Sequence, residues 1–202
     1  MARKSKNKPL KSVIAIYCEG TSEVRYFNML RRKYRGSNIQ AHQVGLEIES
    51  MDSMKGTKLI KEVVKKVRPL RKKKQVNAVF AVFDRDDLSH EDIQSALALA
   101  RDADIKVIFS STNFEVWILL HFMFFSRAYS KTELNTKLSA PEMFNQDYAR
   151  FKGDEYDNYL VDRVATAIKN ARKLAQTKHN LLTDDPYVNI QEYIKEIFGR
   201  ED

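Results

Sequence analysis

At residues 79–87 the sequence reads Val-Phe-Ala-Val-Phe-Asp-Arg-Asp-Asp, five apolar residues followed directly by four charged ones. A continuous apolar run of this length predicts a strand that is buried on both faces, as in a parallel sheet covered by helices. The acidic residues follow at the end of this strand, and open α/β sheets bind ligands at the carboxyl ends of their strands. This segment therefore indicates both a fold class and the edge of the sheet where a site would form.

Similar apolar runs at 13–18 and 105–110 predict two further strands, and a weaker strand is expected at 40–46. Apolar residues at helical spacing predict amphipathic helices between these strands. We expect them from Thr21 or Ser22, one of which serves as the cap, to about Tyr34, from Thr57 to the residue before Pro69, and over 93–100. The alternation predicts an α/β fold with a mostly parallel central sheet flanked by helices.

The rest of the sequence has a helical pattern. Residues 114–125 predict a short helix that is apolar all round and therefore deeply buried. Further helices are expected at 132–138, 160–174 and 190–197, with a turn at 184–186. We expect residues 1–11 to be a disordered basic arm and 12–202 a single domain, with an α/β core over about 12–125 and a helical part over about 126–202.

Composition narrows the classes of function. The 202 residues include 35 Lys and Arg against 27 Asp and Glu, a formal charge of +8 that attracts polyanions such as DNA or RNA. Cys18 is the only cysteine, so no intramolecular disulfide can form, and a cytoplasmic location is expected. The longest apolar run is far shorter than the roughly 20 residues of a membrane span, and we expect neither a signal peptide nor a membrane partner.

Three carboxylates are the main candidates for chemistry. Residues two apart in an extended chain project to the same side, so Asp84 and Asp86 converge while Arg85 points away. Glu19 follows the strand at 13–18 and would join them if the two strands are neighbours. Acidic groups this close repel each other unless a cation or a proton lies between them, and oxygen ligands suit Mg²⁺ or Mn²⁺. We therefore expect Glu19, Asp84 and Asp86 to be catalytic and to bind metal, with Asp87 as a further ligand.

Segments in three parts of the chain resemble the RloB family: Cys-Glu-Gly-Thr-Ser-Glu-Val-Arg-Tyr-Phe at 18–27, Val-Phe-Asp-Arg-Asp-Asp at 82–87, and Asn-Phe-Glu-Val-Trp-Ile-Leu-Leu-His-Phe at 113–122. Asp-Pro-Tyr-Val at 185–188 takes the place of a later family motif. Thr112 stands where the family usually has Pro, which leaves the geometry of that turn open.

RloB proteins are similar to Toprim domains, which carry a Glu after the first strand and Asp-x-Asp after a later one. The resemblance implies a Toprim-like, metal-dependent nuclease of a bacterial phage-defence or restriction-modification-associated system. It also implies an AAA- or ABC-type ATPase as partner.

Other residues are candidates with competing structural explanations. The secondary site candidates are Glu23, Glu115 and His121, and the phosphate-binding candidates are Arg25, Lys58 and Arg85. Glu23 would also stabilise the first turn of a helix, and Glu115 completes a capping-box pattern that begins at Thr112. For His121, a hydrogen-bonded histidine of the core is favoured over a proton carrier.

Two other functions remain open from sequence. The first is a non-catalytic nucleic-acid-binding or scaffold subunit, in which only the basic surface works. The second is phosphotransfer, which is disfavoured because the Asp pair follows a later strand rather than the first. The choice between DNA and RNA and the oligomeric state also stay open.

Overall fold

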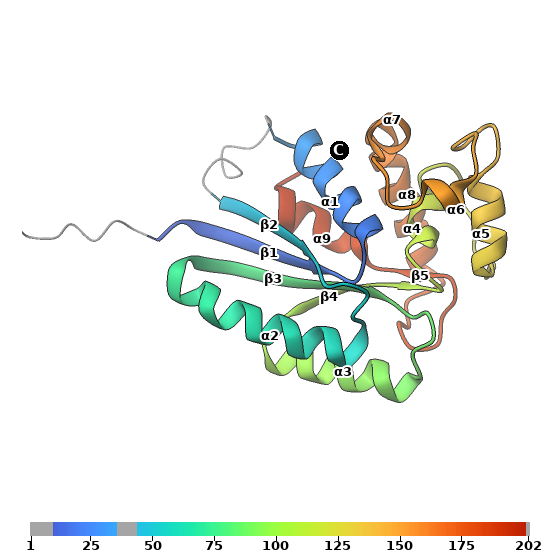
Figure 1. Cartoon of the computed structure of the whole chain (residues 1–202). Coiled ribbons are helices and arrows are strands. Elements are labelled where there is room, and N and C mark those ends of the chain that lie inside the picture. The colour runs from blue at the N-terminus through green and yellow to red at the C-terminus, as the bar shows by residue number, and fades with distance from the viewer. Residues whose placement is uncertain (1–9, 36–43, 201–202) are drawn as a thin grey trace, which may run out of the picture.

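A computed structural model describes residues 10–35 and 44–200 of the chain (Figure 1). Its centre is a five-stranded sheet, whose strands in spatial order are β2 (Val44–Ser50), β1 (Ser12–Cys18), β3 (Gln75–Asp84), β4 (Lys106–Ser111) and β5 (Tyr187–Val188). The first four are parallel, and β5 pairs antiparallel with β4. The predicted α/β class with a mostly parallel sheet is confirmed.

Helices cover both faces of the sheet (Figure 1). On one face lie α2 (Gly56–Lys73) and α3 (His90–Asp102), and on the other lie α1 (Thr21–Lys33) and α9 (Ile190–Phe198). Alternate residues of β3 enter two separate cores, since Phe80 and Val82 pack toward α1 while Ala81 and Phe83 pack toward α2 and α3. Burial on both faces explains why this strand is apolar without a break.

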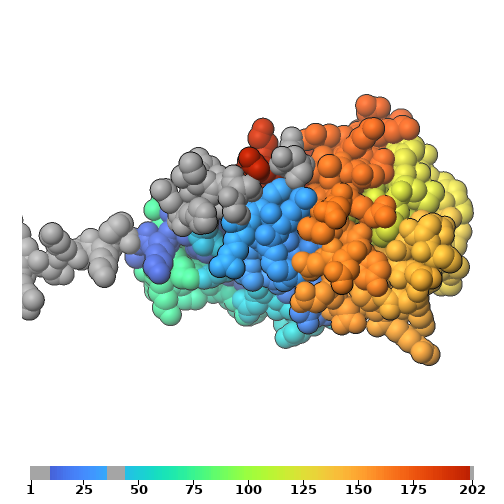
Figure 2. Space-filling view, turned by 90° about the horizontal axis from the view of Figure 1, so that it is seen from above, coloured from blue at the N-terminus to red at the C-terminus, as the bar shows by residue number. Residues whose placement is uncertain are grey.

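The segment between β4 and β5 is mainly helical. It contains α4 (Glu115–Leu120), α5 (Lys131–Leu138), α6 (Tyr148–Phe151), α7 (Asp157–Leu160), a 3₁₀ turn at Val161–Arg163, and α8 (Val164–Ala175). All six residues of α4 are buried, as predicted for a helix that is apolar all round. The orange part of this segment lies against α1 (Figure 2), where Arg32 pairs with Glu155 and Asp157.

Several predicted boundaries were wrong. Helix α2 passes through Pro69 to Lys73, because Val67 and Leu70 continue its apolar stripe against the same core on both sides of the proline. The helix expected from residue 160 becomes regular only at Val164. The weak strand lies at 44–50 instead of 40–46, and positions 40–43 are outside the described residues.

Two predicted helix caps were also wrong. Gly20, and neither Thr21 nor Ser22, is the N-cap of α1. At α4 the N-cap is Phe114. The Thr112 hydroxyl instead donates a hydrogen bond to Asp185 Oδ2 at 3.2 Å, and the Glu115 carboxylate is bound by Lys152.

The predicted arm at 1–11 lies outside the described residues, except for Leu10 and Lys11. Within the described ranges, no helix has both the length and the apolar character that crossing a membrane requires.

Candidate metal centre

The order of strands brings two of the predicted carboxylates together. β1 and β3 are neighbours, and their register pairs Cys18 with Val82. The N–H of Glu19 extends this ladder by donating to Val82 O at 2.8 Å. In return, Glu19 Oε2 accepts a hydrogen bond of 3.4 Å from the N–H of Asp84. The ends of two parallel strands therefore place Glu19 beside Asp84.

Asp86 joins them through a tight turn after β3. Its φ of 38° is in the left-handed region, and its N–H donates to Thr112 O at 3.0 Å. One carboxylate oxygen each from Glu19, Asp84 and Asp86 lies within 4.8 Å of the others. As predicted, Arg85 turns the other way, and its guanidinium donates to Ser111 Oγ at 2.9 Å and to Leu181 O at 2.8 Å.

Asp84 is the buried member of this group. Its Oδ2 accepts a hydrogen bond of 3.3 Å from the N–H of Phe114, whereas its Oδ1 has no partner among the described residues. Burial and the nearby negative charge of Glu19 raise its pKa well above the ordinary range. Burial and the charge of Glu23 likewise raise the pKa of Glu19 to about 7. The positive charges of Lys55 and Lys131 near Glu19, and of Lys152 near Asp84, oppose these rises without cancelling them.

Asp86, in contrast, is compensated by two lysines. Lys55 Nζ lies 3.0 Å from Asp86 Oδ2, and Lys131 Nζ is bound to Oδ1. Asp87 lies outside the group of three: its side chain is 89% exposed, and Lys55 Nζ is 3.7 Å from its Oδ2. The structure thus brings three of the four predicted metal ligands together.

Two more carboxylates lie deeper beside the centre. Glu23 in the first turn of α1 is buried, and burial together with the charge of Glu115 raises its pKa to about 7. Glu115 is fully buried, and its Oε1 pairs with Lys152 Nζ at 2.9 Å. Its Oε2 has no hydrogen-bond partner among the described residues. Charges on Glu23 and Glu115 both raise the pKa of Asp84, so these groups form one electrostatic unit with the centre.

A family model described as RloB-like protein matches residues 14–197. The chain belongs to the RloB-like family. The RloB match includes all three clustered carboxylates together with Glu23 and Glu115. Neither the curated proteins nor the solved structures contain a match to the chain.

Other predicted site residues of this RloB-like chain lie elsewhere. His121 is buried in the core, where its ring nitrogens lie 3.1 Å from Tyr26 Oη and 3.0 Å from Trp117 O. Burial lowers its pKa to about 3, so the ring is neutral at pH 7. Arg25 is bound to Gly153 O and to Glu155, and Lys58 is exposed on α2.

Sequence reasoning missed the three lysines of the site, Lys55, Lys131 and Lys152. A signal for Lys55 exists, because it directly precedes a helix that follows a parallel strand and so lies at the same edge of the sheet as Asp86. Lys131 and Lys152 come from the helical segment of the RloB-like chain after β4. Their spacing in the sequence gives no comparable signal.

Proposed function

We propose that this RloB-like protein hydrolyses phosphodiester bonds of nucleic acid, with Mg²⁺ or Mn²⁺ held by Glu19, Asp84 and Asp86. One observation carries the proposal: carboxylate oxygens from two neighbouring parallel strands lie within 4.8 Å of one another. The donor set fits a hard cation because all of its ligands are oxygen atoms. Asp84 Oδ1, buried and without a described partner, gives such an ion a ligand.

Each side chain has its own role in this proposal. Mg²⁺ bound at such a site activates water and neutralises charge that develops on the phosphate. Asp84 is the rigid ligand, since the N–H of Phe114 fixes its other oxygen. Asp86 would hold the metal in place of its two ammonium groups, and Lys55 and Lys131 would then be free to contact the phosphate. Glu19, which lies beside Asp84 at the end of the neighbouring strand, is the candidate group to accept a proton from water.

The wider setting belongs to the same proposal. A Glu after the first strand and an Asp-x-Asp after a later one are the Toprim pattern, and both are present here. The RloB resemblance implies a role in a bacterial phage-defence or restriction-associated system, in the cytoplasm and beside an AAA- or ABC-type ATPase. The charge of +8 supports a polyanionic substrate.

A non-catalytic nucleic-acid-binding or scaffold role is the second candidate. The observation that favours it is the pairing of Asp86 with Lys55 and Lys131, because two ammonium groups already neutralise one of the three carboxylates. In that case the basic surface would bind nucleic acid and no metal would be needed.

A cleavage assay separates the two. The purified protein is incubated with labelled DNA and RNA in Mg²⁺, Mn²⁺ or EDTA, alone and with its ATPase partner. Cleavage is expected with either metal, and Glu19→Gln and Asp84→Asn should each lower its rate by a factor of about 10² or more. Asp102→Asn, the same change at an exposed position at the end of α3, is the control and should leave the rate unchanged. Equal binding with and without EDTA, and no cleavage in any mixture, would favour the scaffold.

A further inference from the structure

The outer face of α2 carries a regular row of positive charge. Its members, which we call the basic stripe, are Lys58, Lys61, Lys65, Arg68 and Lys72. They are spaced by 3, 4, 3 and 4 residues, so at 3.6 residues per turn they lie along one side of the helix. All five are exposed. At 1.5 Å per residue the row is about 21 Å long.

Packing fixes the direction in which this stripe points. The opposite side of α2 is buried through Leu59, Ile60, Val63 and Val67, which join the core on that face of the sheet. The helix cannot turn about its axis without exposing them. The five cations are therefore held on a rigid surface and face solvent together.

The charge of the stripe is mostly unneutralised. At the side of α2 nearest β2, Lys66 is bound to Glu49 and Lys74 to Glu47. Within the stripe, the structure as described records one ion pair, between Lys65 and Glu62 at 2.9 Å. An exposed pair of this kind contributes little to stability and is easily exchanged. Most of the positive charges of the stripe are thus available to bind anions from outside the chain.

The stripe begins beside the candidate metal centre. Lys55 immediately precedes α2 and binds Asp86, and Lys58 follows it by about one turn of helix. In Figure 1, α2 starts at the carboxyl end of the sheet and runs back along its whole length. A polyanion that lies on the stripe would consequently have one end at the carboxylates.

We propose that the basic stripe binds the phosphodiester backbone of a nucleic-acid duplex and leads it to the candidate metal centre. The direction toward the centre rests on the proposed nuclease function, whereas the binding itself rests on the stripe alone. A duplex fits because α2 contains no aromatic residue, and single strands are usually held by stacking on aromatic side chains. An anionic membrane fits poorly, because the apolar side of α2 is already buried in the fold.

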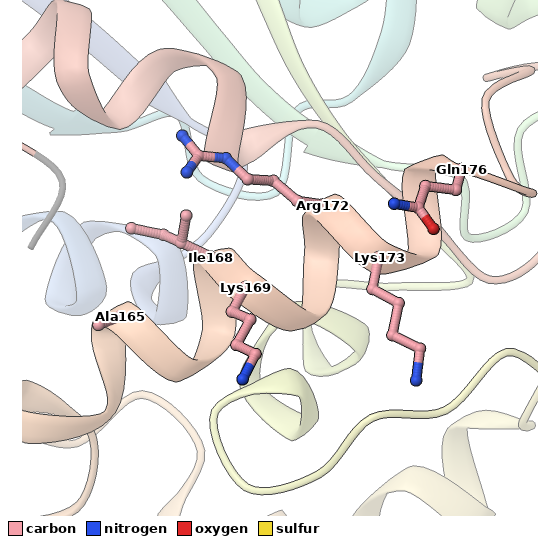
Figure 3. A pocket seen from close by; sticks show the side chains of 6 residues that line it. All are labelled: Ala165, Ile168, Lys169, Arg172, Lys173 and Gln176. Carbon is pink, nitrogen blue, oxygen red and sulfur yellow. The ribbon is translucent and has the colours of Figure 1, made fainter.

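The test compares two variants that lose the same charge from different parts of the fold. The first is Lys61→Gln with Lys65→Gln and Lys72→Gln, on the stripe. The control is Lys169→Gln with Lys173→Gln and Lys178→Gln. Lys169 and Lys173 line a shallow hollow on α8 (Figure 3), and Lys178 follows that helix. Both variants remove three positive charges, so that each has a formal charge of +5, from 8 minus 3.

Binding to labelled duplex DNA, duplex RNA and single strands is measured in EDTA over a range of salt, so that no metal chemistry is needed. We expect the stripe variant to bind duplex at least tenfold more weakly. Its slope of log K against log salt should fall by about 0.9 for each lost contact with a DNA phosphate. The α8 control should bind within twofold of the unaltered protein. Thermal unfolding checks that both variants remain folded.

Equal losses in both variants would overturn the proposal in favour of general charge attraction. The proposal would also be overturned if the stripe variant bound duplex as well as the unaltered protein does, or if the unaltered protein did not bind duplex. A preference of the unaltered protein for single strands or for anionic vesicles would overturn it as well. The nuclease proposal is judged separately. A chain that binds duplex through the stripe but never cleaves it would contradict the nuclease proposal alone.

Discussion

Glu19 Oε2 accepts a hydrogen bond from the backbone N–H of Asp84 at 3.4 Å, although 65 residues separate the two along the chain. The contact exists because the chain leaves β1, forms β2 at the edge of the sheet, and returns through α2 to place β3 on the other side of β1. It holds two carboxyl groups together in a partly buried setting.

Asp84→Asn should stabilise the metal-free protein at pH 8, because it removes a buried carboxyl group whose ionisation is opposed by burial and by the negative charge of Glu19. We expect a gain of about 1–2 kcal/mol in the free energy of unfolding, as for relief of a poorly satisfied buried polar group. For a chain of this size, each kcal/mol of added stability raises the Tm by about 2–4 °C. Thermal unfolding in EDTA measures this rise in Tm. A variant that is less stable than the starting protein under these conditions would contradict the electrostatic account.

The stabilisation by Mn²⁺ should depend on pH. The pKa values of Glu19 and Glu23 are raised to about 7, so between pH 4.5 and 7 the metal-free folded protein holds more protons than the unfolded chain. Its stability therefore falls as pH rises through that range. A bound cation offsets this, and Mn²⁺ should raise the Tm more at pH 8 than at pH 5.5. Glu19→Gln should abolish most of the difference, and Asp102→Asn should not.

Lys152→Met should destabilise the fold, because it leaves the fully buried carboxylate of Glu115 without its cation. The Lys152 side chain is 43% exposed, so solvent screens the pair, and we expect a loss of about 1–2 kcal/mol. Adding Glu115→Gln to the Lys152→Met variant should restore most of the lost stability, since no buried charge then remains at position 115. Chemical denaturation measures all three proteins. Arg150→Gln, which breaks an exposed ion pair with Asp147, is the control and should change stability by less than about 0.5 kcal/mol.

His121 should make the protein sensitive to acid. Its pKa is lowered to about 3 in the fold from 6.5, so between these values the unfolded chain takes up a proton that the folded protein does not. Stability is lost as pH falls below 6.5, by at most about 1.4 kcal/mol per pH unit from this group. His121→Gln should be less stable at pH 7 but should lose less between pH 7 and 5. If the stability of the two proteins changed with pH in parallel, the assignment of a neutral, buried ring to His121 would be refuted.

Gly56→Ala should destabilise α2 at its start. Gly56 has φ of +54°, and an added Cβ would lie 3.1 Å from a methyl group of Leu88. A side chain in the left-handed region costs about 1–2 kcal/mol. Gly45→Ala in β2 is the matched control, because its Cβ would meet only ordinary contacts, the nearest at 3.6 Å from Ser12 O. Denaturant unfolding of both should show a loss for Gly56→Ala alone.

The amino-acid order by itself determined the fold class of this protein. Strands of a parallel sheet that is covered on both faces are apolar throughout, so the run at 79–83 predicted such a strand and placed the acidic residues after it at the strand end. The same reasoning found Glu19, Asp84 and Asp86, because the carboxyl ends of parallel strands share one edge of the sheet.

Only the tertiary structure decided what surrounds those carboxylates. Lys131 and Lys152 reach the centre from the segment after β4, and no local pattern encodes a contact across such a distance in the chain. The same long-range packing carried α2 past Pro69 and bound Glu115 to Lys152, where local rules predicted a helix end and a capping box. Local preferences amount to about 1 kcal/mol or less for most residues and to about 3 kcal/mol for a proline inside a helix, and burial of several apolar side chains, at about 1.5–3 kcal/mol each, exceeds them.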